Sequence, residues 1–222
     1  MTSAIIVAAG SSRRMGFNKL LAPLAGVPVL RRTLEAFQGC EAIGEIVLVG
    51  GDEVFAAVEE WRQGTSLSKV AALVPGGAER HLSVQAGLDA LSASAELVAV
   101  HDGARPLISR NQIAKCVAQA GECGAVACAR PVTETLKRVR EDGQITGAMD
   151  REGAWIMETP QVFRVSLLRD AYAHVLADGL LVTDEVSAMQ HLGHPVWVVA
   201  NASPNPKITF PSDLTLAERF LY

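Results

Sequence analysis

Five short and nearly continuous apolar runs punctuate the first 130 residues of this 222-residue chain, and most are followed by a stretch with helical spacing of its apolar residues. The runs cover residues 4–7, 45–50, 69–74, 97–103 and 124–129. Strands that are apolar on both sides need cover on both faces, which is typical of a parallel sheet with helices on each side. The sequence therefore predicts an α/β fold with a Rossmann-like, doubly wound and mostly parallel sheet.

Residues 133–163 break this rhythm. The stretch "TLKRVREDGQITGAMDREGAW" alternates apolar and polar residues around an "EDG" turn, which is the pattern of a β-hairpin. We expect a β-arm at about 133–160 that projects from a single domain spanning residues 1–222. The last eleven residues predict a terminal helix with Ser212 as its N-cap.

Composition excludes several other classes of protein. The chain has a net charge of −4, which argues against a general nucleic-acid surface, and we expect no nucleic-acid partner. It has no apolar stretch of about 18 residues, so we expect no membrane segment. The four cysteines lack zinc-ligand spacing and are expected to be reduced thiols in a cytoplasmic protein.

The loop after the first apolar run, "AAGSSRRMGFNK" at residues 8–19, carries three cationic side chains in seven positions. It has neither the GxGxxG spacing of dinucleotide sites nor the G-K-[ST] ending of a P-loop. A glycine turn followed by Arg and Lys indicates an anion site, because backbone N–H groups and cations can both contact phosphate. A solvated loop with chance charges is the alternative.

The pattern AAG-x-S-x-RMG-x-x-K resembles the signature of nucleotidyltransferases that join a sugar or polyol phosphate to a nucleotide. Further segments occur in an order similar to that of the 2-C-methyl-D-erythritol 4-phosphate cytidylyltransferase family, which uses CTP in the non-mevalonate isoprenoid pathway. They are "PGGAERHLSV", "HDGARP", "PVTETLK", "MDREGAWIMETPQVF", "TDEVSA" and "NPKIT". The resemblance covers nearly the whole chain.

The resemblance implies a role for each matched residue. Four would be catalytic, namely Arg14, Lys19, Arg151 and Lys207. Seven would bind the nucleotide, namely Ala8, Ala9, Gly10, Gly77, Ser83, Asp102 and Gly103. Five would hold the acceptor phosphate, namely Arg105, Thr135, Arg151, Thr159 and Lys207. Asp102 would also bind Mg²⁺, although an aspartate in this place can instead serve as an N-cap or turn residue.

The family resemblance also implies a homodimer in which the arm carries Thr135 and Arg151 into the partner's site. At Ala78 the sequence departs from the pattern, because relatives often have aspartate there. Three other functions stay open. They are transfer to another polyol phosphate such as ribitol 5-phosphate, a guanylyltransferase of the molybdenum-cofactor type, and a nucleotide-binding module without catalysis. The arm argues against the second, and the retained Arg14, Lys19 and Asp102 argue against the third.

Overall fold

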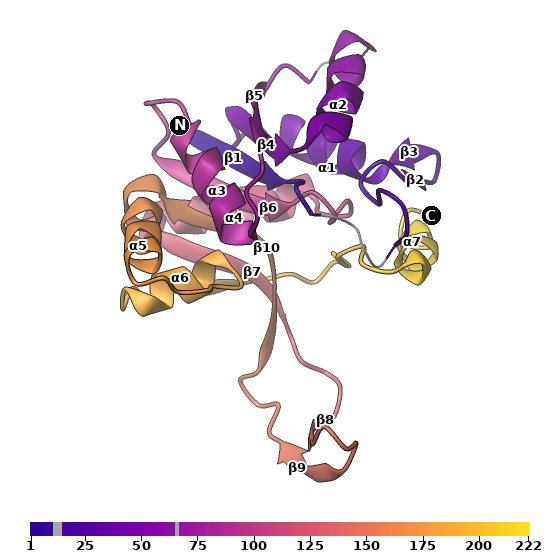
Figure 1. Cartoon of the computed structure of the whole chain (residues 1–222), viewed down its shortest axis with the longest axis vertical. Helices are drawn as coiled ribbons and strands as arrows, with labels where there is room; N and C mark the ends of the chain where they lie inside the picture. The colour runs from indigo at the N-terminus through magenta and orange to yellow at the C-terminus, as the bar shows by residue number, and fades with distance from the viewer. Residues whose placement is uncertain (11–14, 65–66) are drawn as a thin grey trace.

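A seven-stranded sheet forms the centre of the computed structural model, which describes residues 1–10, 15–64 and 67–222 (Figure 1). Its strands, in spatial order, are β11 (Trp197–Ala200), β7 (Ala125–Pro131), β10 (Trp155–Arg164), β6 (Leu97–Asp102), β1 (Thr2–Val7), β4 (Glu45–Gly50) and β5 (Val70–Pro75). Strand β10 is antiparallel to β6 and β7, and the other neighbours pair in parallel. The predicted α/β, mostly parallel sheet is confirmed.

Helices cover both faces of the sheet, and side chains of the strands pack into a hydrophobic cluster on each face. Ile5 belongs to one hydrophobic cluster while its neighbours Ala4 and Ile6 belong to the other, as expected when side chains alternate along a strand. The first cluster includes residues of α1 (Val29–Gln38), α2 (Asp52–Gly64), α4 (Arg110–Cys123) and α7 (Pro211–Glu218). The second includes residues of α3 (Arg80–Asp89), α5 (Val165–Ala177) and α6 (Glu185–His191).

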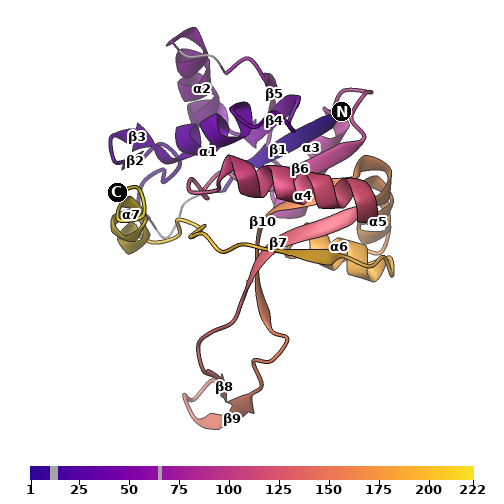
Figure 2. The ribbon, with the colours of Figure 1, turned by 180° about the vertical axis from the view of Figure 1, so that it is seen from behind.

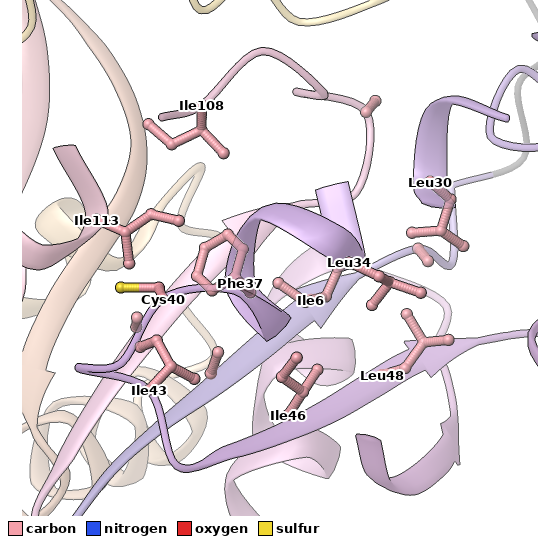
Figure 3. Close-up of a cluster of buried hydrophobic side chains, with 14 of the residues drawn as sticks. Ile6, Leu30, Leu34, Phe37, Cys40, Ile43, Ile46, Leu48, Ile108 and Ile113 are labelled. Atoms are coloured by element: carbon pink, nitrogen blue, oxygen red, sulfur yellow. The ribbon is translucent and has the colours of Figure 1, made fainter. Parts of the chain in front are cut away.

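Figure 3 shows the first cluster where α1 lies over the sheet. Leu34 and Phe37 of the helix point towards Ile6 and Ile46 on neighbouring strands, and all four side chains are fully buried. Burying such side chains contributes about 1.5–3 kcal/mol each relative to exposure. This packing keeps the strand ends, where the functional loops begin, in a fixed arrangement.

The projecting arm is formed by β8 (Leu136–Val139) and β9 (Ile145–Met149), which pair in antiparallel fashion. Gly143 at the turn has a positive φ of 87°, which glycine adopts without steric cost. Both views show the arm extending away from the sheet at the ends of β7 and β10 (Figures 1 and 2). The predicted hairpin is confirmed, but its return strand continues into the sheet, where Gln161–Arg164 pair with β6.

The predicted N-cap at Ser212 is wrong. The terminal helix α7 begins at Pro211, so Ser212 lies inside its first turn, and Phe210 is the N-cap. Proline at the first helical position has a suitable φ, and the Asp213 carboxylate accepts hydrogen bonds from the backbone N–H groups of Thr209 at 2.7 Å and Phe210 at 2.8 Å. None of the helices in the described ranges has the length and apolar character that crossing a membrane requires.

Candidate active site

A pocket of about 610 Å³ lies at the carboxyl ends of β1, β5 and β6. Ligands in open parallel sheets bind at this edge. Four chain segments line it, contributing Val7, Ala8, Ala9, Gly10, Lys19 and Leu20; Gly77, Ala78, Glu79, Arg80 and Ser83; Asp102 and Ala104; and Lys207 and Thr209. The loops after the first, third and fourth parallel strands thus meet at one site, as the sequence predicts.

Glycines allow the loops around the pocket to approach each other closely. A Cβ atom added to Gly76 would lie 2.2 Å from the Cβ of Ala9, which is far below a normal contact distance. A Cβ on Gly77 would lie 2.5 Å from the Cβ of Leu82. Any larger residue at Gly76 would therefore separate the loop after β5 from the loop after β1. Sequence reasoning missed Gly76, although it stands beside Gly77 in the same motif.

Ser83 holds the loop after β5 against the first turn of α3. The backbone N–H of Gly77 donates to Ser83 Oγ at 3.1 Å, and Ser83 Oγ donates to the backbone carbonyl of Glu79 at 3.1 Å. The side chain of Ser83 is buried, yet the residue borders the pocket. Its hydroxyl therefore fixes the backbone that faces a ligand.

Asp102 is the main buried charge of the pocket and is surrounded by cations. Its Oδ2 lies 3.1 Å from Lys207 Nζ and 3.2 Å from Arg105 Nε, and its Oδ1 lies 3.6 Å from Arg80 Nε. Burial alone would raise the pKa of Asp102, but the charges of Lys207, Arg80 and Arg105 outweigh it and lower that pKa well below the ordinary value. Asp102 is therefore ionised at neutral pH.

The segment that carries Lys207 is tied to β10 by buried hydrogen bonds. Asn205 Nδ2 donates to the backbone carbonyl of Thr159 at 2.9 Å and to Glu158 Oε2 at 3.2 Å. The carbonyl of Asn205 accepts from Arg105 Nη1 at 2.8 Å. The position of Lys207 thus depends on the strand that leads back from the arm.

A chain of hydrogen bonds lies beneath Asp102. The backbone N–H of Asp102 donates to Thr159 Oγ1 at 3.1 Å, and Thr159 Oγ1 lies 2.9 Å from His101 Nδ1. Because His101 Nε2 faces the backbone carbonyl of Arg105 at 3.2 Å, Nε2 carries the proton and Nδ1 accepts from the threonine hydroxyl. His101 is thus a neutral structural residue that holds Thr159 under the pocket.

His101 makes the stability of the fold depend on pH. Burial lowers its pKa to about 3, whereas the unfolded chain titrates near pH 6.5, so only the unfolded state gains a proton as the pH falls below 6.5. As the pH falls from 7.5 to 5, we expect protonation of this residue in the unfolded state to reduce the free energy of unfolding by about 2 kcal/mol. Urea unfolding of His101→Gln should show a correspondingly weaker pH dependence than wild type. The exposed His191→Gln control should match wild type, and a His101→Gln slope equal to wild type would contradict the prediction.

Eight of the predicted site residues line the pocket, and the others fall into three groups. The eight are Ala8, Ala9, Gly10, Lys19, Gly77, Ser83, Asp102 and Lys207. Gly103, Arg105 and Thr159 lie next to the pocket, where their contacts position the residues that line it. Thr135 and Arg151 are exposed on the arm and do not line the pocket. Arg14 lies outside the described residues.

Asp102 is a single candidate metal ligand. In the described parts of the chain, His, Cys, Asp and Glu side chains form no group of three or more that could hold a metal ion. Among the described residues, two cations contact Oδ2 closely, whereas the contact of Oδ1 with Arg80 is longer. An ionised carboxylate that lines the pocket suits Mg²⁺, which commonly takes one or two protein carboxylates and completes its shell with phosphate and water.

Comparisons with known proteins cover the full length of the chain. The family model described as 2-C-methyl-D-erythritol 4-phosphate cytidylyltransferase matches residues 2–222. Relatives of that name from Bacillus licheniformis and Symbiobacterium thermophilum are 40% and 41% identical, covering 98% and 99% of this chain and 94% and 92% of theirs.

Solved structures agree with the sequence matches. The 4-diphosphocytidyl-2C-methyl-D-erythritol synthase of Anaerococcus prevotii superimposes with a TM-score of 0.87 at 30% identity, covering 100% of this chain and 96% of that one. The 2-C-methyl-D-erythritol 4-phosphate cytidylyltransferase of Thermus thermophilus gives 0.81 at 31% identity, covering 100% and 99%. The chain belongs to the 2-C-methyl-D-erythritol 4-phosphate cytidylyltransferase family.

Proposed function

We propose that the protein transfers the cytidylyl group of CTP to 2-C-methyl-D-erythritol 4-phosphate, giving 4-diphosphocytidyl-2-C-methyl-D-erythritol and pyrophosphate. The main structural support for this proposal is the grouping of three charged side chains around one pocket. Lys19, Asp102 and Lys207, from three separate segments, border one pocket in a chain that matches the family from residue 2 to 222.

In the reaction, an oxygen of the acceptor phosphate attacks the α-phosphorus of CTP. A new P–O bond forms, the bond from the α-phosphorus to the bridging oxygen breaks, and pyrophosphate leaves with that electron pair. The attacking oxygen is already anionic at neutral pH, so no general base is required. Catalysis therefore depends on positioning and on stabilising negative charge.

The nucleotide occupies the side of the pocket formed by the loops after β1 and β5. Residues 8–10 and Gly77 offer backbone groups at close range because their side chains are small or absent. Gly103 packs beneath them, with its N–H donating to the carbonyl of Val7 at 2.9 Å. Lys19 and Arg14 contact the phosphates and stabilise charge that develops in the transition state.

Mg²⁺ is the proposed cofactor, with Asp102 as its ligand from the protein. When bound, it would neutralise charge on the phosphate oxygens. The residues around Asp102 hold this carboxylate in position. Lys207 and Arg105 keep Asp102 ionised and in place, and Thr159 holds its backbone from below.

The acceptor phosphate binds on the side of the pocket near Lys207, Arg105 and Thr159. The two positive charges of Lys207 and Arg105 there outnumber the one negative charge of Asp102. Thr135 and Arg151 complete this side from the arm of a second copy, which makes the active form a homodimer. Support comes from the arm itself, where Val139 is 57% and Ile145 is 65% exposed. Apolar side chains so exposed on a projecting hairpin suit a protein partner.

The cytoplasmic location expected from the sequence remains a prediction.

Substrate identity is tested by pyrophosphate release with Mg²⁺ and every combination of CTP, GTP, ATP or UTP with methylerythritol 4-phosphate, ribitol 5-phosphate or no acceptor. We expect CTP with methylerythritol 4-phosphate to give the highest kcat/KM. The best rate with ribitol 5-phosphate would overturn the acceptor, and the best rate with GTP would overturn the nucleotide. Release that needs no acceptor would show hydrolysis instead of transfer.

A further inference from the structure

An ion pair beside the pocket joins helices α3 and α6, and its carboxylate is buried. Arg80 starts α3, and Glu185 starts α6, 105 residues later. Arg80 Nη1 donates to Glu185 Oε1 at 2.6 Å and Nη2 donates to Oε2 at 3.0 Å, which is the two-pronged geometry of a strong pair. Glu185 is fully buried, while Arg80 is partly exposed and lines the pocket.

Several contacts fix Glu185 in place. Tyr172 Oη donates to Glu185 Oε1 at 2.9 Å. The neighbouring Asp184 caps α6 by accepting from the backbone N–H of Ser187 at 3.0 Å, and it also accepts from Gln161 Nε2 on β10 at 3.0 Å. The carboxylate that holds Arg80 is thus anchored to both α5 and the central sheet.

The guanidinium of Arg80 is shared between two carboxylates. Its two Nη atoms contact Glu185, and its Nε lies 3.6 Å from Asp102 Oδ1. Because a guanidinium is planar, binding both Nη atoms to Glu185 also fixes the direction of Nε. The orientation of Arg80 towards the pocket, and towards Asp102, is therefore set by Glu185.

Stability alone gives little reason for this arrangement. A buried ion pair is often no more stabilising than well-packed apolar residues of similar size, because both charges lose hydration. Its value here is geometric. A shift of about 1 Å in a positioning group can reduce a rate by about 100-fold.

We propose that Glu185 is a positioning residue for the nucleotide, acting through Arg80, and that it touches neither substrate. This inference rests on the proposed function for its choice of CTP as ligand. Glu185→Gln keeps the size of the side chain and removes its charge, so Arg80 loses its fixed direction. We expect the Kd for CTP to rise about 10- to 100-fold, as for the loss of a charge-assisted contact, with kcat/KM for CTP falling in parallel and KM for the acceptor changing less than threefold.

The test compares Glu185→Gln, Arg80→Gln and the double variant by CTP titration, steady-state kinetics and urea unfolding. Arg80→Gln leaves the buried Glu185 carboxylate without its cation, and Glu185→Gln leaves Arg80 with only its longer described contact to Asp102, so each single variant should lose stability. The double variant has a neutral pair that can hydrogen-bond, so its stability should recover while its CTP affinity stays at least tenfold below wild type. Recovery of both stability and CTP affinity to within threefold of wild type would show a merely structural pair and overturn the proposal.

Glu45→Gln provides a matched control. Glu45 is also a buried carboxylate, and its Oε2 accepts from Ser3 Oγ at 2.6 Å. It lies at the amino end of β4, whereas the pocket lies at the carboxyl ends of the parallel strands. It should lose stability and keep wild-type CTP affinity; if it lost CTP affinity as Glu185→Gln does, the positioning role would fall. A wild-type protein that binds CTP without turning over methylerythritol 4-phosphate would overturn the proposed function, and the CTP titrations would still decide the role of Glu185.

Discussion

Replacing Lys19 with alanine is expected to reduce kcat for cytidylyl transfer by about 100- to 1,000-fold, the usual cost of losing one group that stabilises transition-state charge. Lys19 borders the pocket that also contains Asp102 and Lys207. The reacting phosphates carry several negative charges and gain more as pyrophosphate leaves, so a nearby ammonium favours the transition state over the ground state. The measurement is kcat at saturating CTP and acceptor, with the folded state followed by circular dichroism and urea unfolding.

Lys115→Ala is the matched control, because it removes the same charge from an exposed position on α4 that does not border the pocket. It should keep wild-type kcat and stability. A Lys19→Ala protein with near-normal kcat at saturating CTP would remove Lys19 from the catalytic role. A raised KM for CTP with unchanged kcat would likewise reduce Lys19 to ground-state binding.

The sheet could be predicted from the sequence because its parallel strands are local apolar runs. The run at residues 45–50 coincides with β4, and the run at 97–103 contains β6. Strand β10 was harder to predict, since its place between β6 and β7 depends on pairing with strands that are distant in the sequence. The pattern around residues 133–163 predicts the hairpin but not that its return strand enters the sheet.

The site could be predicted only in part for a similar reason. Lys19, Ser83 and Asp102 stand in recognisable motifs at strand ends, and the topology brings those ends together. Arg80 and Glu185 also stand in motifs, but neither motif contains a sign that their side chains meet across 105 residues. An acidic residue in the first turn of a helix is common for electrostatic reasons, so the sequence gives no sign that the Glu185 side chain is buried and paired with Arg80.

Two inactive variants are expected to restore each other when they form one dimer. In the proposed homodimer each pocket uses Lys19 from one chain and Arg151 from the arm of the other, so Lys19→Ala and Arg151→Ala homodimers each have two damaged sites. A heterodimer of the two variants has one site with both changes and one site with neither. Co-expressed chains with different tags, purified through both tags, should therefore show about half of the wild-type kcat per dimer.

Lys19→Ala combined with Lys207→Ala is the control that separates an arm exchanged between chains from simple stabilisation by a partner. Both residues border the same pocket of the same chain, so every site in that heterodimer carries one change and should stay inactive. Recovery with Arg151→Ala but not with Lys207→Ala would place Arg151 in the partner's site. Failure of both mixtures, or an active Arg151→Ala homodimer, would contradict the shared site, because the exposed Arg151 would then serve only its own arm, where it donates to the backbone carbonyl of Thr133.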